Sequence, residues 1–305
     1  MIKVFGHKSP DTDCTGSAII AAWYYTNILK QPATPYILGD LNPETEFVLK
    51  HWGFEVPEVL STIKEGDKVV IVDTNNAEEL PEDLDKAEIL EIIDHHRLMG
   101  NLKTNYVVKV TIKTLASTGG LLGSMMMDHW NEVPTNIKGL ILSCILSDTL
   151  EFRSPTTTPT DKKMGENLAK ELELNISELA TAMFAAKSDV SAFSAEELVK
   201  MDSKVAEFNG KMYRIGVLET ASPETVLNRK AELLEAQLKV CQDEKLEEAF
   251  LFVIDILREE ATLLVPNKAT KQMAEQSFEI QVEGDTVVLP GIVSRKKQII
   301  PQLKV

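Results

Sequence analysis

The apolar residues of the first 187 positions alternate between short β-branched runs and longer helical patterns. Runs such as IKVF, VVIV and ILEII have the length and composition of buried strands, and apolar residues at helical spacing occupy several of the stretches between and after them. This alternation is typical of a parallel sheet covered by helices. It predicts an α/β domain, with strands at 2–5, 69–72 and 89–93 and helices at 16–30, about 118–130 and 135–147.

The pattern changes near residue 188, which predicts a second, smaller domain. The segment SDVSAFS is rich in small and polar residues and follows a helical pattern that ends near Lys187. A length of 305 residues also fits two domains. We therefore expect an N-terminal domain at 1–187, a linker at 188–194 and a mixed α/β C-terminal domain at 195–305. In the C-terminal domain the pattern predicts helices near 195–202, 223–242 and 267–275 and strands near 211–218, 249–256, 262–265 and 278–289.

Acidic residues outnumber basic ones, 47 against 32, and the net charge is −15. Polyanions are bound mainly by Lys and Arg, so this balance argues against a general binder of nucleic acid or of membrane surfaces. No apolar run approaches the roughly 20 residues that a membrane-spanning helix needs, and the first residues lack the apolar core of a signal peptide. We therefore expect a cytoplasmic protein with no nucleic-acid or membrane partner.

The three cysteines, Cys14, Cys144 and Cys241, lie far apart in the sequence and form no CxxC pair. Sparse, unpaired cysteines are typical of a reducing compartment. We expect neither a disulfide nor a thiolate metal site.

Polar side chains follow each of the three predicted strands of the N-terminal domain. Gly6-His7 comes after the first strand, Asp73 after the second and Asp94-His95-His96 after the third. The carboxyl ends of parallel strands share one edge of the sheet, where open α/β sheets bind their ligands. These residues should therefore converge on one site.

The loop GHKSPDTD after the first strand contains His7, Asp11 and Asp13. In an extended segment, Asp11 and Asp13 would point to opposite sides and could serve two adjacent ions. The alternative is that one of them caps a helix beginning near Thr15, with His7 incidental. Asp73, taken alone, could equally be a turn residue.

Asp94-His95-His96 places three potential ligands at the end of one strand. Adjacent histidines cannot share one direction, so one can ligate a metal while the other faces a substrate. The remaining histidines, His51 and His129, lie beside tryptophans on predicted helices and are expected to be packing or surface residues. Asp148 closes an apolar helical run, where the helix dipole disfavours an acid unless a cation compensates it. An ordinary surface position is the alternative.

Oxygen and imidazole ligands without sulfur suit Mn²⁺, and with lower preference Co²⁺, Mg²⁺ or Zn²⁺. Four aspartates carry enough charge for two divalent ions. Two metals about 3.5–4 Å apart polarise phosphoryl oxygens and generate hydroxide from water at neutral pH, so phosphoryl hydrolysis is the natural reaction. The candidate ligands are His7, Asp11, Asp13, Asp73, His95 and Asp148.

The C-terminal domain contains the basic cluster Ser294-Arg295-Lys296-Lys297-Gln298, a candidate phosphate clamp in an otherwise acidic chain. An exposed basic turn is the alternative. The run Ser117-Thr118-Gly119-Gly120 could hold an anion at a helix N-terminus or could simply cap that helix. Local pattern does not distinguish Lys204 from a solvated lysine.

At GHKSPDTD, the end of VVIVD, DHH and SRKKQ, the chain closely resembles the family II inorganic pyrophosphatases of the DHH phosphoesterase superfamily, over essentially its whole length. DHH is shared by the superfamily, whereas DHH together with a C-terminal SRKKQ is specific to this branch. The resemblance implies hydrolysis of pyrophosphate to two phosphates by a hydroxide bridging two Mn²⁺, with additional Mg²⁺ brought by the substrate. It also implies an active site in the cleft between the domains and a homodimer formed through the N-terminal domain.

The resemblance assigns roles to individual residues. One Mn²⁺ would be held by His7, Asp11 and Asp73, and the other by Asp13, Asp73, His95 and Asp148, with Asp73 bridging the two. The phosphoryl groups would be contacted by His96, Lys204, Arg295 and Lys296. Asp94 would orient a histidine.

Two positions depart from the family pattern. Thr74 stands where the family often has His, and Ser9 stands where Asn is common; neither change removes a ligand named above. A short-chain exopolyphosphatase, a DHH-type phosphodiesterase and a non-catalytic metal-dependent binding protein remain alternatives. The phosphodiesterase branches carry a glycine-rich GGGH-like motif, and none occurs here.

Overall fold

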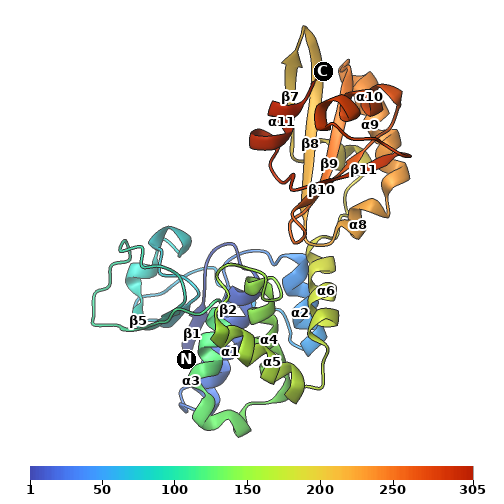
Figure 1. Cartoon of the computed structure of the whole chain (residues 1–305). Helices are drawn as coiled ribbons and strands as arrows, with labels where there is room; N and C mark the ends of the chain where they lie inside the picture. The colour runs from blue at the N-terminus through green and yellow to red at the C-terminus, as the bar shows by residue number, and fades with distance from the viewer. Residues whose placement is uncertain (305) are drawn as a thin grey trace. The chain divides into compact units, whose positions relative to one another are not determined.

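The computed structural model describes residues 1–304, and the chain divides into two compact units, Met1–Ala186 and Lys187–Val305 (Figure 1). We refer to them as the N-terminal unit and the C-terminal unit. Within the described residues, the first contains a parallel sheet and the second a mixed sheet. The predicted α/β fold class is confirmed.

The sheet of the N-terminal unit has six strands in the order β3-β2-β1-β4-β5-β6, and every neighbouring pair is parallel. The strands are β1 (Ile2–Phe5), β2 (Ala33–Ile37), β3 (Glu58–Val59), β4 (Lys68–Val72), β5 (Glu88–Asp94) and β6 (Lys109–Ile112). From β1 the chain adds strands toward one edge, and from β4 it adds them toward the other. The carboxyl ends of β1 and β4 therefore form the switch point at which sheets of this type bind ligands.

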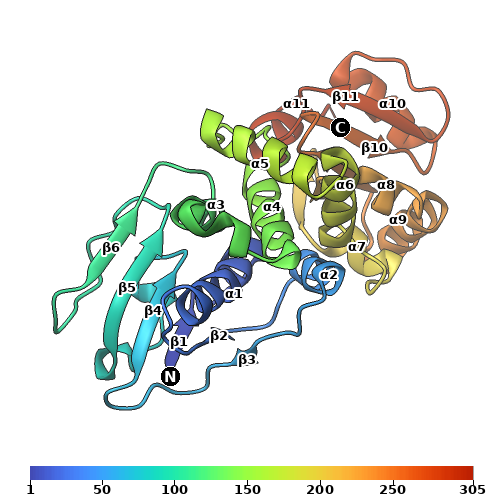
Figure 2. The same ribbon diagram turned by 90° about the horizontal axis from the view of Figure 1, so that it is seen from below.

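Helices cover one face of this sheet. Of these, α1 (Thr12–Asn27) packs on β1 and β2, α3 (Thr118–Met125) packs on β5, and α4 (Thr135–Thr149) packs on both helices (Figure 2). Both α1 and α4 are buried on nearly all sides, which explains their small and apolar composition. The loops on the opposite face contribute Ile63, Leu80 and Leu84 to a core with Phe5 and Ile71. The unit also contains α2 (Pro43–Trp52), α5 (Pro159–Glu171) and α6 (Ile176–Lys187).

Several predicted boundaries in the N-terminal unit are wrong. The first helix begins at Thr12, not at residue 16, because Asp11 caps it. The helix predicted over 118–130 ends at Met125 and is followed by a 3₁₀ helix, η3 (Met127–Glu132). The pattern also failed to indicate β2 and β6, because both are short and largely half-buried or exposed, without a continuous apolar run.

Within residues 187–304, the C-terminal unit contains a five-stranded sheet in the order β11-β10-β9-β8-β7, in which only β8 and β9 pair in parallel. The strands are β7 (Ser203–Phe208), β8 (Lys211–Thr220), β9 (Glu248–Asp255), β10 (Glu260–Leu264) and β11 (Thr286–Pro290). The helices are α7 (Ala195–Lys200), α8 (Pro223–Leu227), α9 (Lys230–Glu244), α10 (Lys268–Phe278) and α11 (Ile300–Gln302). The central strand β9 is buried along its whole length, and separate apolar clusters form on the two faces of the sheet.

Two predictions for this unit need correction. The helix predicted over 223–242 is two helices, α8 and α9, because the backbone of Arg229 between them leaves helical geometry, with φ of −100° and ψ of 15°. The strand predicted over 278–289 is confined to β11, because α10 continues to Phe278. Strand β7 was not predicted.

Cys14, Cys144 and Cys241 are free thiols, and the first two are buried. In the described part of the chain, no helix combines the length and the apolarity that crossing a membrane requires.

Candidate metal centre

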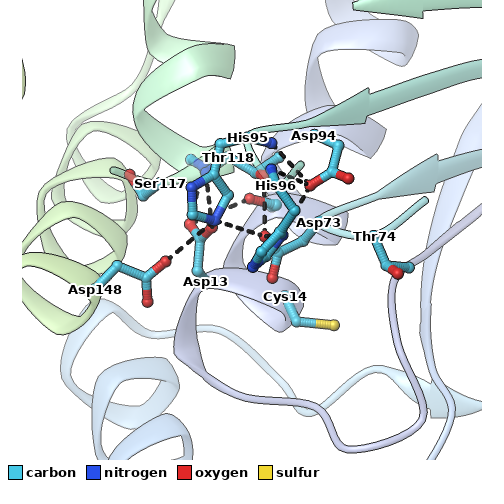
Figure 3. Close-up of polar contacts among 12 residues, drawn as sticks. Asp13, Cys14, Asp73, Thr74, Asp94, His95, His96, Ser117, Thr118 and Asp148 are labelled. Atoms are coloured by element: carbon cyan, nitrogen blue, oxygen red, sulfur yellow. Dashed lines mark hydrogen bonds and ion pairs between the residues drawn. The ribbon is translucent and has the colours of Figure 1, made fainter. Parts of the chain in front are cut away.

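The residues that follow β1, β4 and β5 lie close together, with one end of α1 and one end of α4 beside them (Figure 3). Asp73 is at the centre of this cluster. It follows β4 directly, is buried, and has a left-handed backbone with φ of 60°. A non-glycine residue adopts this conformation at a cost of order 1 kcal/mol, and such residues concentrate at functional sites. The Asp73 amide donates to the carbonyl of Ile93 at 2.9 Å, which fixes the turn.

The two carboxylate oxygens of Asp73 face different imidazoles. Oδ2 lies 3.4 Å from Nε2 of His7, and Oδ1 lies 3.4 Å from Nε2 of His95. The Thr118 hydroxyl donates a hydrogen bond to Oδ1 at 3.0 Å. Although burial opposes ionisation, His7 and His95 hold the pKa of Asp73 below its usual range. Asp73 is therefore an ionised carboxylate placed between two groups of potential ligands.

Asp11 both caps α1 and faces His7. One oxygen accepts from the amide of Cys14 at 2.9 Å, and the other lies 3.8 Å from Nε2 of His7. The two interpretations of this loop, cap and ligand, are thus compatible. The prediction that Asp11 and Asp13 lie on an extended segment was wrong, because the helix begins between them at Thr12.

Asp13 lies in the first turn of α1 and is completely buried. Its carboxylate accepts from the backbone amides of Thr118 at 2.7 Å and Gly119 at 2.9 Å, which are the first two residues of α3. A Cβ at Gly119 would lie 2.5 Å from Cβ of Cys144, so only glycine allows this approach. Ser117 caps α3, as the alternative for the run Ser117–Gly120 predicted, and the amides at this helix N-terminus are taken by the chain's own Asp13 carboxyl.

His95 directs a buried nitrogen toward three carboxylates. Its Nδ1 lies 3.1 Å from the carbonyl of Leu115, which can only accept, so Nδ1 carries a proton. Its Nε2 faces Asp73, Asp13 at 3.8 Å and Asp148 at 3.6 Å, and it has no hydrogen-bond partner among residues 1–304. An imidazole oriented by a backbone carbonyl, with its other nitrogen enclosed by carboxylates, is the usual geometry of a metal ligand.

The pKa values of the cluster reflect the crowding of carboxylates around His95. Burial lowers the pKa of His95, but the Asp73 and Asp13 carboxylates outweigh this effect and raise it to about 9. Burial and the charge of Asp73 raise the pKa of Asp13 well above its usual range. Without a cation the cluster thus retains protons that a divalent ion would displace. Oxygen and nitrogen donors of this kind fit Mn²⁺ or a similar divalent metal.

Asp94 lies behind the histidines, on the side away from Asp13 and Asp148 (Figure 3). Its Oδ1 accepts from the amides of His95 and His96 and lies 2.9 Å from Nδ1 of His96, while Oδ2 accepts from the Asn75 side chain at 2.6 Å. This orients His96, whose side chain is 52% exposed and whose pKa Asp94 raises. His96 is thus a partly exposed imidazole in a fixed orientation beside the candidate ligands.

The two positions that depart from the family pattern lie outside the group of ligands. Thr74 donates its hydroxyl to Glu79 at 2.6 Å, within the loop after β4. Ser9 lines an open basin of about 1670 Å³ next to His7, Asp73, His95 and Asp148. Neither residue displaces a candidate ligand.

The basic cluster of the C-terminal unit forms a single turn of π-helix, Arg295–Ile299. Ser294 caps this turn through the Lys297 amide, and the Gln298 side chain accepts from the amides of Val293 and Ser294. Arg295 donates to the carbonyl of Asp202 at 2.6 Å and pairs with its carboxylate at 2.8 Å. Because Asp202 is two residues before Lys204, Arg295 lies next to the start of the strand that carries Lys204. Lys296 is exposed.

Three residues in contact with the site were not singled out as candidates. Thr118 was considered only as part of a run that could hold an anion at a helix N-terminus or cap that helix, and nothing in the sequence indicates that its hydroxyl reaches Asp73. Asn75 holds Asp94 and the loop after it. Cys14 lies within reach of His7 and Asp73, although its buried thiol has a raised pKa and was not expected to ligate.

The fold and the site define a two-unit protein of the DHH type with a candidate two-metal centre. Residues 1–147 match the DHH family N-terminal domain, and residues 181–305 match the DHHA2 domain. The manganese-dependent inorganic pyrophosphatase of Methanocaldococcus jannaschii is 34% identical over 100% of this chain and 98% of its own length. A Staphylococcus haemolyticus protein named "Probable manganese-dependent inorganic pyrophosphatase" is 36% identical over 98% of this chain and 96% of its own length. The chain belongs to the manganese-dependent, family II inorganic pyrophosphatases.

Solved structures agree with this placement. A candidate family II inorganic pyrophosphatase from Methanococcus jannaschii matches with a TM-score of 0.61 and 34% identity, over 99% of this chain and 98% of the other. An exopolyphosphatase-related protein from Bacteroides fragilis matches with a TM-score of 0.50 over 98% of this chain and 89% of the other. Its identity of 13% shows a shared fold only.

Proposed function

We propose that this protein hydrolyses inorganic pyrophosphate to two phosphates at a pair of Mn²⁺ ions. The observation that carries the proposal is Asp73, whose two oxygens face His7 and His95 separately. One ion would be held by His7, Asp11 and Asp73, and the other by Asp13, Asp73, His95 and Asp148. When bound, divalent ions of this kind polarise phosphoryl oxygens and lower the pKa of water.

The chain's own residues supply the remaining interactions. His96, held through Nδ1 by Asp94, would carry a proton on Nε2 and donate it to an oxygen of the departing phosphate. Arg295, Lys296 and Lys204 would bind the charged phosphoryl oxygens, Arg295 through two parallel N–H donors. Additional Mg²⁺ would enter with the substrate. We also assign residues 188–194 as the linker between the two domains.

Phosphate release tests this proposal directly. The protein is stripped with a chelator, reloaded with Mn²⁺ and supplied in excess Mg²⁺ with pyrophosphate, tripolyphosphate or a dinucleotide. Turnover that requires Mn²⁺ and is confined to pyrophosphate is the expected result. Preference for tripolyphosphate would indicate an exopolyphosphatase, and preference for the dinucleotide would indicate a phosphodiesterase. Binding without turnover would indicate a non-catalytic protein.

We further propose a homodimer formed through the N-terminal unit. Strand β6 is at the edge of the sheet, and the segment leading into it exposes Leu98, Tyr106 and Val107, followed by Val110 on the strand itself. An unpaired strand edge beside exposed apolar side chains is suited to pairing with a second copy. Light scattering after size-exclusion chromatography would refute this proposal if it gave the mass of one chain at micromolar concentration.

The acidic charge and free cysteines support a cytoplasmic location and the absence of nucleic-acid partners.

A further inference from the structure

Glu44 is a buried carboxylate that joins two segments carrying candidate metal ligands. It lies in the first turn of α2 and is 1% exposed. Its Oε1 accepts from the Thr12 hydroxyl at 2.7 Å and also from the Ser147 hydroxyl. Thr12 stands between Asp11 and Asp13, and Ser147 immediately precedes Asp148. One oxygen atom thus connects the start of α1 to the end of α4.

The surrounding contacts hold Glu44 in place. The Thr45 hydroxyl oxygen lies 3.2 Å from that of Thr12. Asn42 caps α2 by accepting from the amide of Thr45 at 2.9 Å and from its hydroxyl at 3.1 Å. A buried carboxylate with two hydroxyl donors and a capped helix behind it has little freedom to move.

The other end of α2 is fixed to the same helix, α4. The indole of Trp52 donates to the Ser143 hydroxyl at 2.9 Å, and its ring lies so close to Gly139 that a Cβ there would come within 2.4 Å of it. Since Glu44 meets Ser147 at one end and Trp52 meets Ser143 at the other, α2 runs antiparallel along α4. Helix α2 is therefore attached to α4 at both of its ends, and its Glu44 end is next to the candidate metal centre.

We propose that Glu44 is a positioning residue that sets the spacing between the ligands on α1 and Asp148 on α4. The inference rests on the two-metal site of the proposed function. Asp11 is assigned to one ion, and Asp13 and Asp148 to the other, so the link between Thr12 and Ser147 governs how both ions are held. Removing the carboxylate leaves two buried hydroxyls without this acceptor and loosens the link between the two helix ends, although α1 and α4 remain packed against each other.

Mn²⁺ binding to the metal-stripped full chain tests the proposal without relying on turnover. Electron paramagnetic resonance reports the number of bound ions, their affinities and the magnetic coupling between them, which depends on their separation. Removing a group that orients metal ligands typically lowers metal affinity about 10-fold to 100-fold. E44A should therefore lower the affinity for the second Mn²⁺, the ion assigned to Asp13 and Asp148, at least about 10-fold and alter the magnetic coupling. E44Q keeps Oε1 as an acceptor and should stay within about threefold of the wild type, well short of that loss.

S143A is the matched control, because it removes a hydrogen bond between the same two helices at the far end. It should lower thermal stability while leaving Mn²⁺ affinity and coupling unchanged. If E44A cannot be purified as a folded protein, S147A is used instead. It removes one hydrogen-bond donor to Glu44 only and should still lower the affinity for the second Mn²⁺. Wild-type binding and coupling in E44A, or in S147A where E44A does not fold, would overturn the proposal. So would equal loss of affinity in S143A and E44A, because that indicates a general effect of stability. A wild-type chain that binds fewer than two Mn²⁺ would instead overturn the proposed function.

Discussion

Raising the pH should weaken the metal-free fold and strengthen metal binding over the same interval. The pKa of His95 rises from 6.5 to about 9 in the folded protein, because Asp73 and Asp13 lie beside it. A group whose pKa is higher in the folded state stabilises the fold fully below its unfolded pKa, and this contribution is lost as the pH rises through the folded value. The relevant interval is therefore pH 6.5 to about 9. At about 1.4 kcal/mol for each pH unit, His95 should contribute about 3 kcal/mol that is absent above this interval.

A divalent ion must displace the His95 proton and a proton held by Asp13, so its apparent affinity should rise at least about tenfold for each pH unit below about pH 9. The assay is urea unfolding of the chelated protein at pH 6.5, 7.5 and 9, together with Mn²⁺ titration calorimetry in buffers of different ionisation enthalpy. Calorimetry should detect the release of at least about one proton at pH 7.5, because His95 is protonated there in the metal-free protein. A metal-free stability that does not fall with pH, combined with no proton release, would refute this account of the site.

Three substitutions test other parts of the proposed site. Asp73→Ala should abolish binding of at least one Mn²⁺, because it removes the carboxylate between His7 and His95; wild-type stoichiometry by metal analysis would contradict the bridging assignment. Thr118→Val should weaken Mn²⁺ binding about 10-fold to 100-fold, the equivalent of about 1.5–3 kcal/mol for a hydrogen bond to a charged group, whereas Thr118→Ser should not. Arg295→Ala should raise the KM for pyrophosphate at least about tenfold with bound Mn²⁺ unchanged, while Lys297→Ala in the same turn should have little effect. Similar KM values in these two variants would make the turn a surface feature.

The sequence predicts which residues gather but not how they are held. His7, Asp73 and His95 could be expected to meet because each follows a strand of one parallel sheet, and strand ends are visible as apolar runs that stop at a polar residue. The prediction that Asp148 is a ligand had less support, since an acid near the end of a helix is usually a surface residue. Its position beside His95 depends on the packing of α4 against α1 and α3.

The contacts that orient the ligands were largely hidden. The Asp13 carboxylate meets the first turn of α3, more than 100 residues away in the sequence, and the Ser-Thr-Gly-Gly run indicates only that a helix begins there. Glu44 looks like an ordinary acidic residue in the first turn of a helix, where the dipole favours it. Long-range contacts of this kind follow from helix packing, which local patterns do not encode.

The two amides that hold Asp13 belong to the main chain, so substitutions that change only side chains leave them in place. An alanine scan across α3 would detect the contribution of the Thr118 hydroxyl. It would not detect the contribution of the two backbone amides that donate to Asp13. Proline is the exception. Thr118 is the first residue of the helix, where proline is well tolerated, and the extended backbone of Ser117 already suits a following proline. Thr118→Pro would therefore replace one ligand-holding donor of the backbone with a methylene group directed at the Asp13 carboxylate, with Thr118→Val accounting for the lost hydroxyl.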